Sequence, residues 1–253
     1  INAARGAGYQ APSGAVVVMD PRSGAIRAMA SFPDYDPRIL ADGITTDEFK
    51  RLNDPDHNAW LNRAIQAVAP PGSTFKVVTA GAAMWSGVAG PYDAIECPGS
   101  RVFPPEGDPN SVTFNNWTSH YYGYVGFPRS LEISCDTFYY ELGWRMEEAY
   151  GASNGDGTEK FQKYARTAGL GHETGIDLRY EADGVVPDQK WLTQLCKALG
   201  PGCNEGWLPG YTVNMSIGQG DVQTTPLQVL LVEDNDINAL LARRMLEKAG
   251  CEV

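Results

Sequence analysis

Two short apolar runs near the start of the chain are separated by a turn. The runs cover residues 15–20 and 25–31, and Pro21-Arg22-Ser23-Gly24 lies between them. Runs of β-branched and apolar residues that are bounded by proline, serine and glycine are typical of strands joined by a tight turn. We therefore predict a β-hairpin that forms part of the core sheet.

A longer apolar segment follows Lys76. Pro71 and Gly72 stand before it, where such residues favour the start of a helix. The apolar positions that follow are typical of a helix suited to burial, and they are Val77, Val78, Ala80, Ala82, Ala83 and Met84. The sequence therefore predicts a buried helix with Ser73 at its N-terminal end.

A third apolar run, Val229–Val232, lies near the end of the chain and is followed by Glu233 and Asp234. Residues 239–249 then have the pattern of an amphipathic helix, and Gly250 is a helix stop. A short apolar strand that ends in acidic residues, followed by such a helix, is typical of the start of a βαβ unit. We predict a strand at residues 229–232 and a helix after it.

The candidate chemistry begins with Ser73 and Lys76. A spacing of three residues on a helix puts both side chains on one face, so the Lys76 amine reaches the Ser73 hydroxyl. A serine hydroxyl needs a base to attack an acyl group at neutral pH, and a lysine can serve only when it is neutral. Partial desolvation beside other positive groups lowers the pKa of a lysine. The pair predicts a nucleophile and its base, at a helix start that favours negative charge.

Further motifs accompany this pair along the chain. Ser134-Cys135-Asp136 lies in an apolar and aromatic setting, and it is followed by the segments 214–221 and Thr225-Pro226-Leu227-Gln228. With residues 14–29 before the serine, the pattern resembles the transpeptidase domain of class B penicillin-binding proteins, most of all the penicillin-binding protein 2-like members. The resemblance covers about residues 13–228, and its motifs are specific in combination.

The resemblance implies a fold, an activity and a site. The fold is α/β of the α+β type, the serine β-lactamase-like fold in which a helical subdomain packs on a mainly antiparallel sheet. The activity is a peptidoglycan D,D-transpeptidase that forms a serine acyl-enzyme with D-Ala-D-Ala stem peptides and is trapped by β-lactams. By position, Ser73 is the nucleophile, Lys76 its base and Ser134 a proton relay to the leaving group. Asp136 completes the second motif.

Ser134 and Asp136 are also the expected substrate contacts. Many relatives have Asn where this chain has Asp136, and an ionised carboxylate only accepts hydrogen bonds. A direct substrate contact therefore rests more on Ser134. The resemblance further implies no cofactor, a glycosyltransferase partner and a place on the extracytoplasmic face of the bacterial inner membrane. The membrane anchor of such proteins has no counterpart in a chain that begins at Ile1 and has no long apolar span.

The third motif of the family, Lys-Thr-Gly, is not among the 253 residues. Thr174-Gly175 follows a glutamate and matches a different family segment. In relatives the motif lies on a strand after Thr-Pro-Leu-Gln and supplies one of two backbone N–H donors for the oxyanion. We therefore expect residues 1–228 to be a transpeptidase domain cut before this strand, with turnover near background.

Residues 229–253 resemble the opening of a response-regulator receiver domain. In a complete receiver, Glu233 and Asp234 would help to hold magnesium. A segment of this length cannot bury an independent core, so we expect a receiver-like β-α fragment without receiver activity. The sequence predicts a junction of two unrelated fragments near Gln228.

Composition adds limits to these expectations. A net charge of −11 and the lack of a basic stripe disfavour a nucleic-acid partner. No metal site is predicted, because the three histidines have no ligand-like spacing. Of the five cysteines, Cys196 and Cys203 flank a Gly-Pro-Gly turn, and whether they pair is left open. Cys135 is interpreted as a small buried residue.

Two alternative functions stay open. A penicillin-recognising sensor or a class D-like β-lactamase shares Ser-x-x-Lys, although the segments Asn115-Asn116-Trp117, 174–178 and 216–220 favour the transpeptidase. A phosphorelay receiver fragment is suggested only by residues 229–253. The aromatic group Trp117, Tyr121, Tyr122, Tyr124 and Phe127 is assigned to loop and core packing, with a place in the substrate groove as the alternative.

Overall fold

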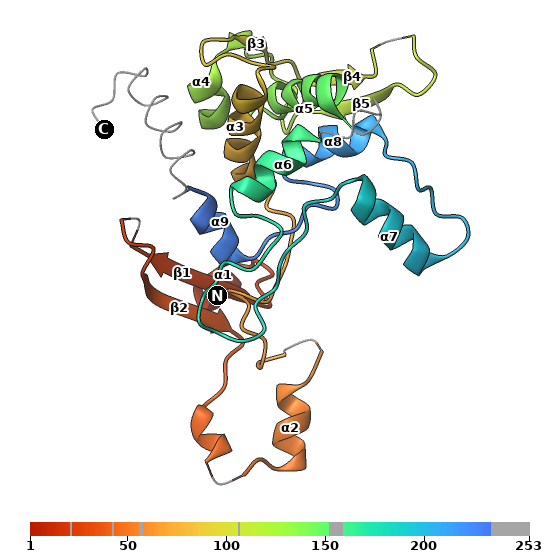
Figure 1. Cartoon of the computed structure of the whole chain (residues 1–253). Helices are drawn as coiled ribbons and strands as arrows, with labels where there is room; N and C mark the ends of the chain where they lie inside the picture. Colours follow the sequence, from red (N-terminus) through yellow and green to blue (C-terminus); the bar gives the residue numbers. More distant parts are fainter. Residues whose placement is uncertain (21, 42, 56–57, 106, 152–158, 234–253) are drawn as a thin grey trace.

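The computed structural model of the chain describes residues 1–20, 22–41, 43–55, 58–105, 107–151 and 159–233. Within these ranges the fold is mixed α/β, and all paired strands are antiparallel. Figure 1 shows most of the helices gathered in one body, with the β1–β2 hairpin at its edge. The segment that carries α2 extends beyond the hairpin, away from the helices.

The predicted hairpin is confirmed. Strands β1 (Gly14–Met19) and β2 (Ile26–Phe32) pair antiparallel, and Pro21 of the turn lies outside the described residues. Side chains alternate along β1 as a half-buried strand requires. Val17 packs toward the core, whereas Val16 on the opposite face is 60% exposed. Helix α1 (Asn2–Gly6) precedes the hairpin.

A short segment that follows β2 forms η1 (Pro37–Leu40) and α2 (Thr46–Leu52). Thr45 and Glu48 form a capping box at the start of α2, with each side chain accepting a hydrogen bond from the backbone of the other residue. These local bonds explain why a short helix forms in the extension seen at the bottom of Figure 1.

The predicted buried helix is also confirmed. A 3₁₀ turn, η2 (Gly72–Phe75), runs directly into α3 (Lys76–Ser86), and α3 ends at Gly87 in the left-handed conformation. Small residues of α3 allow close packing against α5 (Asp136–Tyr150) and α6 (Lys160–Thr167). At Gly81 a Cβ atom would lie 2.2 Å from the Tyr164 hydroxyl, so only glycine fits this crossing.

Two small sheets lie against α5 at one end of the helical body. Strand β3 (Ile95–Glu96) pairs with β6 (Tyr124–Val125), and β4 (Ser100–Phe103) pairs with β5 (Val112–Asn115). Helix α4 (Phe127–Glu132) follows β6 and leads into the Ser134 motif. The sheets therefore bring the segment around residues 97–117 next to the start of α5.

Helices α7 (Gln189–Leu199) and α8 (Pro209–Met215) follow α6 in the chain. Helix α8 packs on α5, and Gly143 of α5 allows this approach because a Cβ there would lie 2.8 Å from Ser216 Cβ. Cys196 of α7 and Cys203 after it, whose pairing the sequence left open, form a disulfide. No helix in the described ranges is both long enough and apolar enough to cross a membrane.

The strand predicted at Val229–Val232 is wrong. These residues belong to helix α9 (Pro226–Glu233), which runs without a break through Gln228. Thr225 and Gln228 form a capping box, in which Gln228 N–H donates to Thr225 Oγ1 and Thr225 N–H donates to Gln228 Oε1. Within the described ranges, residues 229–232 therefore pair with no strand.

Helix α9 links the hairpin to the helical body. Leu227 is buried with Ile65, and Leu231 packs against the same cluster as Val17 of the hairpin. Figure 1 shows α9 between the hairpin and α3. Asp234 and the helix expected at residues 239–249 lie outside the described residues.

Candidate active site

Ser73 lies on the exposed 3₁₀ turn that begins the buried helix α3. Gly218 supports this turn, because its carbonyl accepts a hydrogen bond from Gly72 N–H at 2.9 Å. Gly218 has a φ of +71°, and a Cβ there would lie 2.2 Å from Gly72 O. A glycine at residue 218 therefore allows the backbone to approach the nucleophile turn.

Lys76 is buried, with 1% of its surface exposed, and its amine contacts the Ser134 motif. Nζ donates to Ser134 Oγ and to Ser134 O, each at 2.9 Å, and to Asp136 Oδ1 at 2.5 Å. The amine therefore has three acceptors from one short segment. This arrangement fixes its place within the site.

The link to Ser73 runs through Ser134. Ser134 Oγ donates to Ser73 Oγ at 2.9 Å, while no hydrogen bond joins Lys76 Nζ directly to Ser73 Oγ among the described residues. The structure thus brings together the four residues named from sequence, Ser73, Lys76, Ser134 and Asp136. It differs from the predicted direct contact because the second hydroxyl stands between amine and nucleophile.

Ser134 has an unusual backbone conformation. Its φ is +51°, in the left-handed region that residues other than glycine rarely adopt. The residue lies between α4 and α5, where Ser134 N–H donates to Leu131 O and Cys135 N–H donates to Ser130 O. Strained residues of this kind cluster at functional sites, because the surrounding structure must hold them there.

Burial lowers the pKa of Lys76 below its ordinary value of 10.5. The hydrogen bond and the charge of Asp136 act in the opposite direction and favour the ammonium form. The sequence predicts desolvation of Lys76 beside other positive groups. The desolvation is present, but the charge beside Lys76 is negative.

Asp136 is the first residue of α5, and both of its carboxylate oxygens are bonded to protein groups. Oδ1 accepts from Lys76, and Oδ2 accepts from Trp117 N–H at 3.0 Å. Asn116 Oδ1 in turn accepts from the N–H groups of Asp136 and Trp117, each at 3.0 Å. Asn116 and Trp117 thus hold the second motif from the segment that follows β5.

The aromatic group expected in loops and core divides between the two. Phe127 is buried in the core, whereas the indole of Trp117 is exposed and donates to Ile133 O at 3.0 Å. In the sequence, Asn116 and Trp117 are recognisable only as part of a segment that favours the transpeptidase family. Their contacts to the Ser134 motif have no signal in spacing, because 17 positions separate Trp117 from Ser134.

A disulfide joins the second motif to a distant segment. Cys135, which stands between Ser134 and Asp136, is bonded to Cys97, and both cysteines are fully buried. The interpretation of Cys135 as a buried residue is confirmed, but its pairing was missed. The sequence separation is 38 residues, and no motif connects the two positions.

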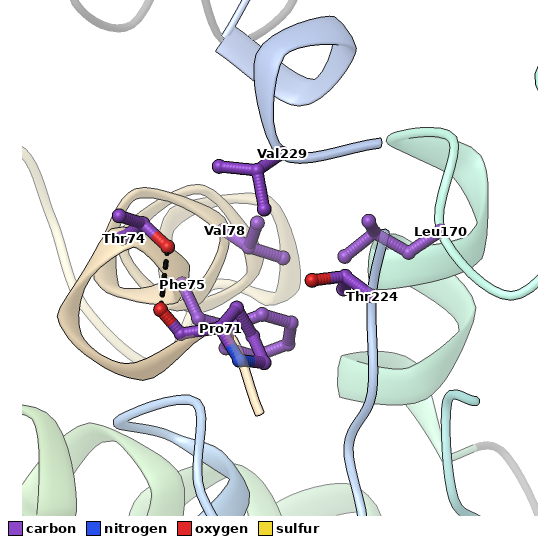
Figure 2. Close-up of a pocket in the computed structure, with 7 residues that line it drawn as sticks. All are labelled: Pro71, Thr74, Phe75, Val78, Leu170, Thr224 and Val229. Atoms are coloured by element: carbon purple, nitrogen blue, oxygen red, sulfur yellow. Dashed lines mark hydrogen bonds between the residues drawn. The ribbon is translucent and has the colours of Figure 1, made fainter. Parts of the chain in front are cut away.

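An apolar pocket lies on the other side of the nucleophile turn. Figure 2 shows Val229 of α9 and Val78 of α3 pointing into it, with Thr74 beside them. Thr74 Oγ1 donates to Pro71 O at 2.8 Å, which supports the turn. The pocket is lined by neither Ser73 nor Lys76, so we treat it as packing space behind the site. Within the described ranges, no group of histidines, cysteines and carboxylates could hold a metal ion.

Comparisons with known proteins identify the family of this chain. Residues 14–232 match the family described as Penicillin binding protein transpeptidase domain. The peptidoglycan D,D-transpeptidase MrdA of Acinetobacter baumannii is 34% identical over 218 residues, which is 86% of this chain. The chain spans 29% of the length of that relative.

Two solved structures have a similar fold. The Helicobacter pylori PBP2 chain in a complex with MreC aligns with a TM-score of 0.73 and 28% identity, covering 87% of this chain and 37% of that one. Penicillin-binding protein A of M. tuberculosis, solved as an imipenem acyl-enzyme complex, aligns with a TM-score of 0.64 and 26% identity, covering 87% and 45%. With the family match over most of its length, this chain belongs to the penicillin-binding protein transpeptidase domain family.

Proposed function

We propose that this chain carries the acylation site of a peptidoglycan D,D-transpeptidase, with Ser73 as its nucleophile. The observation that carries the proposal is the hydrogen-bonded series from Lys76 Nζ through Ser134 Oγ to Ser73 Oγ. Its substrate is the D-Ala-D-Ala end of a stem peptide. β-lactams react at the same serine, as the acyl-enzyme of the M. tuberculosis relative supports.

In the proposed first step, Ser73 Oγ attacks the penultimate D-alanine carbonyl. When Lys76 is neutral, the same contacts allow Ser73 O–H to donate to Ser134 Oγ and Ser134 O–H to donate to Nζ. The proton of Ser73 thereby moves to the amine as the Oγ–C bond forms. The path then runs in reverse, and Ser134 delivers a proton to the nitrogen of the departing D-alanine.

In the second step, an amine from a neighbouring peptidoglycan strand displaces Ser73 from the ester. Lys76 again takes a proton by way of Ser134. We assign Asp136 to the positioning of Lys76, because both of its oxygens already accept hydrogen bonds from the protein. Substrate contact is assigned to Ser134, whose side chain is partly exposed.

The tetrahedral oxyanion needs two donors. Ser73 N–H lies in the first turn before α3, where N–H groups have no acceptor within the helix. The second donor belongs to the Lys-Thr-Gly strand of the family, which is not among the 253 residues. We propose that this chain alone acylates roughly 100- to 1000-fold more slowly than the same chain extended through that strand.

We further propose an extracytoplasmic location at the bacterial inner membrane and a glycosyltransferase partner. Two disulfides are typical of an oxidising compartment. The complex of the H. pylori relative with MreC supports assembly with other proteins of wall synthesis. No nucleic-acid partner is proposed for a chain with a net charge of −11.

A penicillin sensor or class D-like β-lactamase remains the second candidate, since both use the same acylation chemistry. A β-lactamase must release its acyl group rapidly, so a stable penicillin adduct favours the transpeptidase. A receiver function for residues 229–253 requires phosphate transfer, and acetyl phosphate should leave no label on the chain.

The proposal is tested by labelling with a fluorescent penicillin. We expect slow labelling that disappears in Ser73→Ala and accelerates when the third-motif strand is added. Ser23→Ala is the matched control, because it removes an exposed hydroxyl from the turn between β1 and β2, outside the site, and should label at the original rate. Labelling that persists in Ser73→Ala would exclude Ser73 as the nucleophile.

A further inference from the structure

The Ser134 motif lies at the junction of α4 and α5. Ser134 has left-handed backbone geometry, and it connects two helices without belonging to either. Its hydroxyl must nevertheless stay within hydrogen-bonding distance of both Lys76 and Ser73. Two backbone hydrogen bonds hold the segment to α4, and further support comes from outside the two helices.

The Cys97–Cys135 disulfide reaches the motif from outside these helices. Cys97 follows β3 and is fixed by its own backbone, since its N–H donates to Gly123 O at 2.8 Å and its carbonyl accepts from Tyr122 N–H at 3.0 Å. Cys135 Sγ also accepts from Phe138 N–H at 3.3 Å and so caps α5. The bond ties the start of α5 to a firmly held strand end.

Polar contacts around the disulfide point to the same function. Thr137 Oγ1 donates to Pro98 O at 2.8 Å, and Asn116 Nδ2 contacts Cys97 Sγ at 3.7 Å. Asn116 is also the residue that accepts from Asp136 N–H. The disulfide therefore stands within the same network that holds the carboxylate against Lys76.

We propose that the Cys97–Cys135 disulfide is a positioning element for acyl transfer, which holds Ser134 Oγ between Lys76 Nζ and Ser73 Oγ. Neither sulfur contacts the reacting atoms, so both cysteines act through Ser134 and Asp136. The inference rests on the proposed function, because it concerns the rate at which Ser73 is acylated.

Loss of the bond is a redox step with a defined balance. A dithiol reductant attacks one sulfur, breaks the S–S bond and forms a mixed disulfide, which its second thiol then resolves. The protein gains two electrons and two protons as two thiols, and the reductant becomes a disulfide. The segment 134–136 then loses its covalent link to Cys97 and relaxes away from the geometry of the site.

The test compares two double variants of the full chain. Cys97→Ser/Cys135→Ser removes the proposed positioning bond, and Cys196→Ser/Cys203→Ser removes the other disulfide as a matched control. The readouts are the rate constant of Ser73-dependent labelling by a fluorescent penicillin, the fraction of protein labelled, and the far-UV circular dichroism. We expect the first variant to label roughly 10- to 100-fold more slowly with unchanged helix content, and the control to keep the original rate.

A second measurement treats the unmodified chain with dithiothreitol and counts the free thiols of Cys97 and Cys135 by mass spectrometry. Labelling should slow in step with reduction of this pair and recover on reoxidation. Equal labelling rates in the oxidised and reduced chain would overturn the inference alone. Loss of helix content in step with labelling would also overturn it, because the bond would then hold the fold. An unmodified chain without Ser73-dependent labelling would instead refute the proposed function and this inference with it.

Discussion

Lys76 combines a buried amine with a carboxylate that opposes its neutral form. Burial lowers the pKa of Lys76, while Asp136 favours the ammonium. The proposed base is the neutral amine, whose fraction grows as pH rises through the lowered pKa. We expect the acylation rate constant to increase with pH and to level off below pH 10.5, the ordinary value for lysine. Stopped-flow labelling with a chromogenic β-lactam measures this profile, and a flat profile would contradict Lys76 as base.

Asp136 can be tested in the same profile. Asp136→Asn removes the negative charge beside Nζ, so the pKa of Lys76 falls further and the midpoint of the profile moves to lower pH. Glu141→Gln makes the same charge change further along α5, where the carboxylate pairs with Arg101 and Arg145, and should leave the midpoint in place. A shift shared by both variants would point to a general charge effect.

Gly218 supports the nucleophile turn by close contact. Ala at this position would strain a backbone with φ +71° and place Cβ 2.2 Å from Gly72 O. Gly220 has a similar φ of +73°, but a Cβ there would meet its nearest atom at 3.7 Å. We expect Gly220→Ala to cost about 1–2 kcal/mol of folding free energy and Gly218→Ala about 1–3 kcal/mol more. Only Gly218→Ala should slow labelling, and urea unfolding measures the stability difference.

The residues of the site were largely predictable, whereas their connections were not. Ser73, Lys76, Ser134 and Asp136 belong to short motifs, and the motifs alone name them. Asn116 and Cys97 come from separate segments, and only the fold brings them to the motif. Spacing along a chain cannot encode such contacts, so neither the relay through Ser134 nor the Cys97–Cys135 disulfide is predictable from the sequence.

At the scale of elements, Gln228 joins three parts of the chain. It is fully buried and caps α9, and its Nε2 donates to His172 O at 2.9 Å and to Asp183 O at 2.7 Å. Gln228→Ala leaves both carbonyls without this donor, and we expect a loss of roughly 2–4 kcal/mol. Gln223→Ala, at a partly buried position nearby, should cost less than about 1 kcal/mol. Thermal unfolding of both variants checks the difference, and equal losses would contradict this role of Gln228.

The hairpin and α3 followed from their apolar patterns, but α9 did not. Val229–Val232 is a short apolar run, and such a run fits a buried strand or a buried helix equally well. The deciding signal lies just before it, since Thr225-Pro226-Leu227-Gln228 has the Thr-x-x-Gln form of a capping box with proline at the first helical position. Local capping overrode the strand propensity of the valines.

At the scale of the whole molecule, the expected boundary at Gln228 falls inside a helix. The family match extends to residue 232, and Val229 and Leu231 pack against the body of the chain. We propose that the transpeptidase unit extends through α9 and that any receiver-like segment begins after it. Residues 234–253 lie outside the described structure.

Two shortened chains test this boundary. A chain that ends at Glu233 should unfold at the same temperature as the full chain. A chain that ends at Gln228 loses the contacts of Val229 and Leu231, and we expect it to be about 2–4 kcal/mol less stable. Calorimetry measures both, and equal stability of the two shortened chains would favour the boundary at Gln228.

The left-handed backbone of Ser134 opposes folding stability to reactivity with penicillin. Glycine would adopt the φ of +51° with little strain and would also delete the hydroxyl that links Lys76 to Ser73. Selection for heat resistance alone would therefore tend to replace this serine. Laboratory evolution of more stable variants should therefore also select for reaction with penicillin at every round. Otherwise the surviving proteins will be stable and inactive.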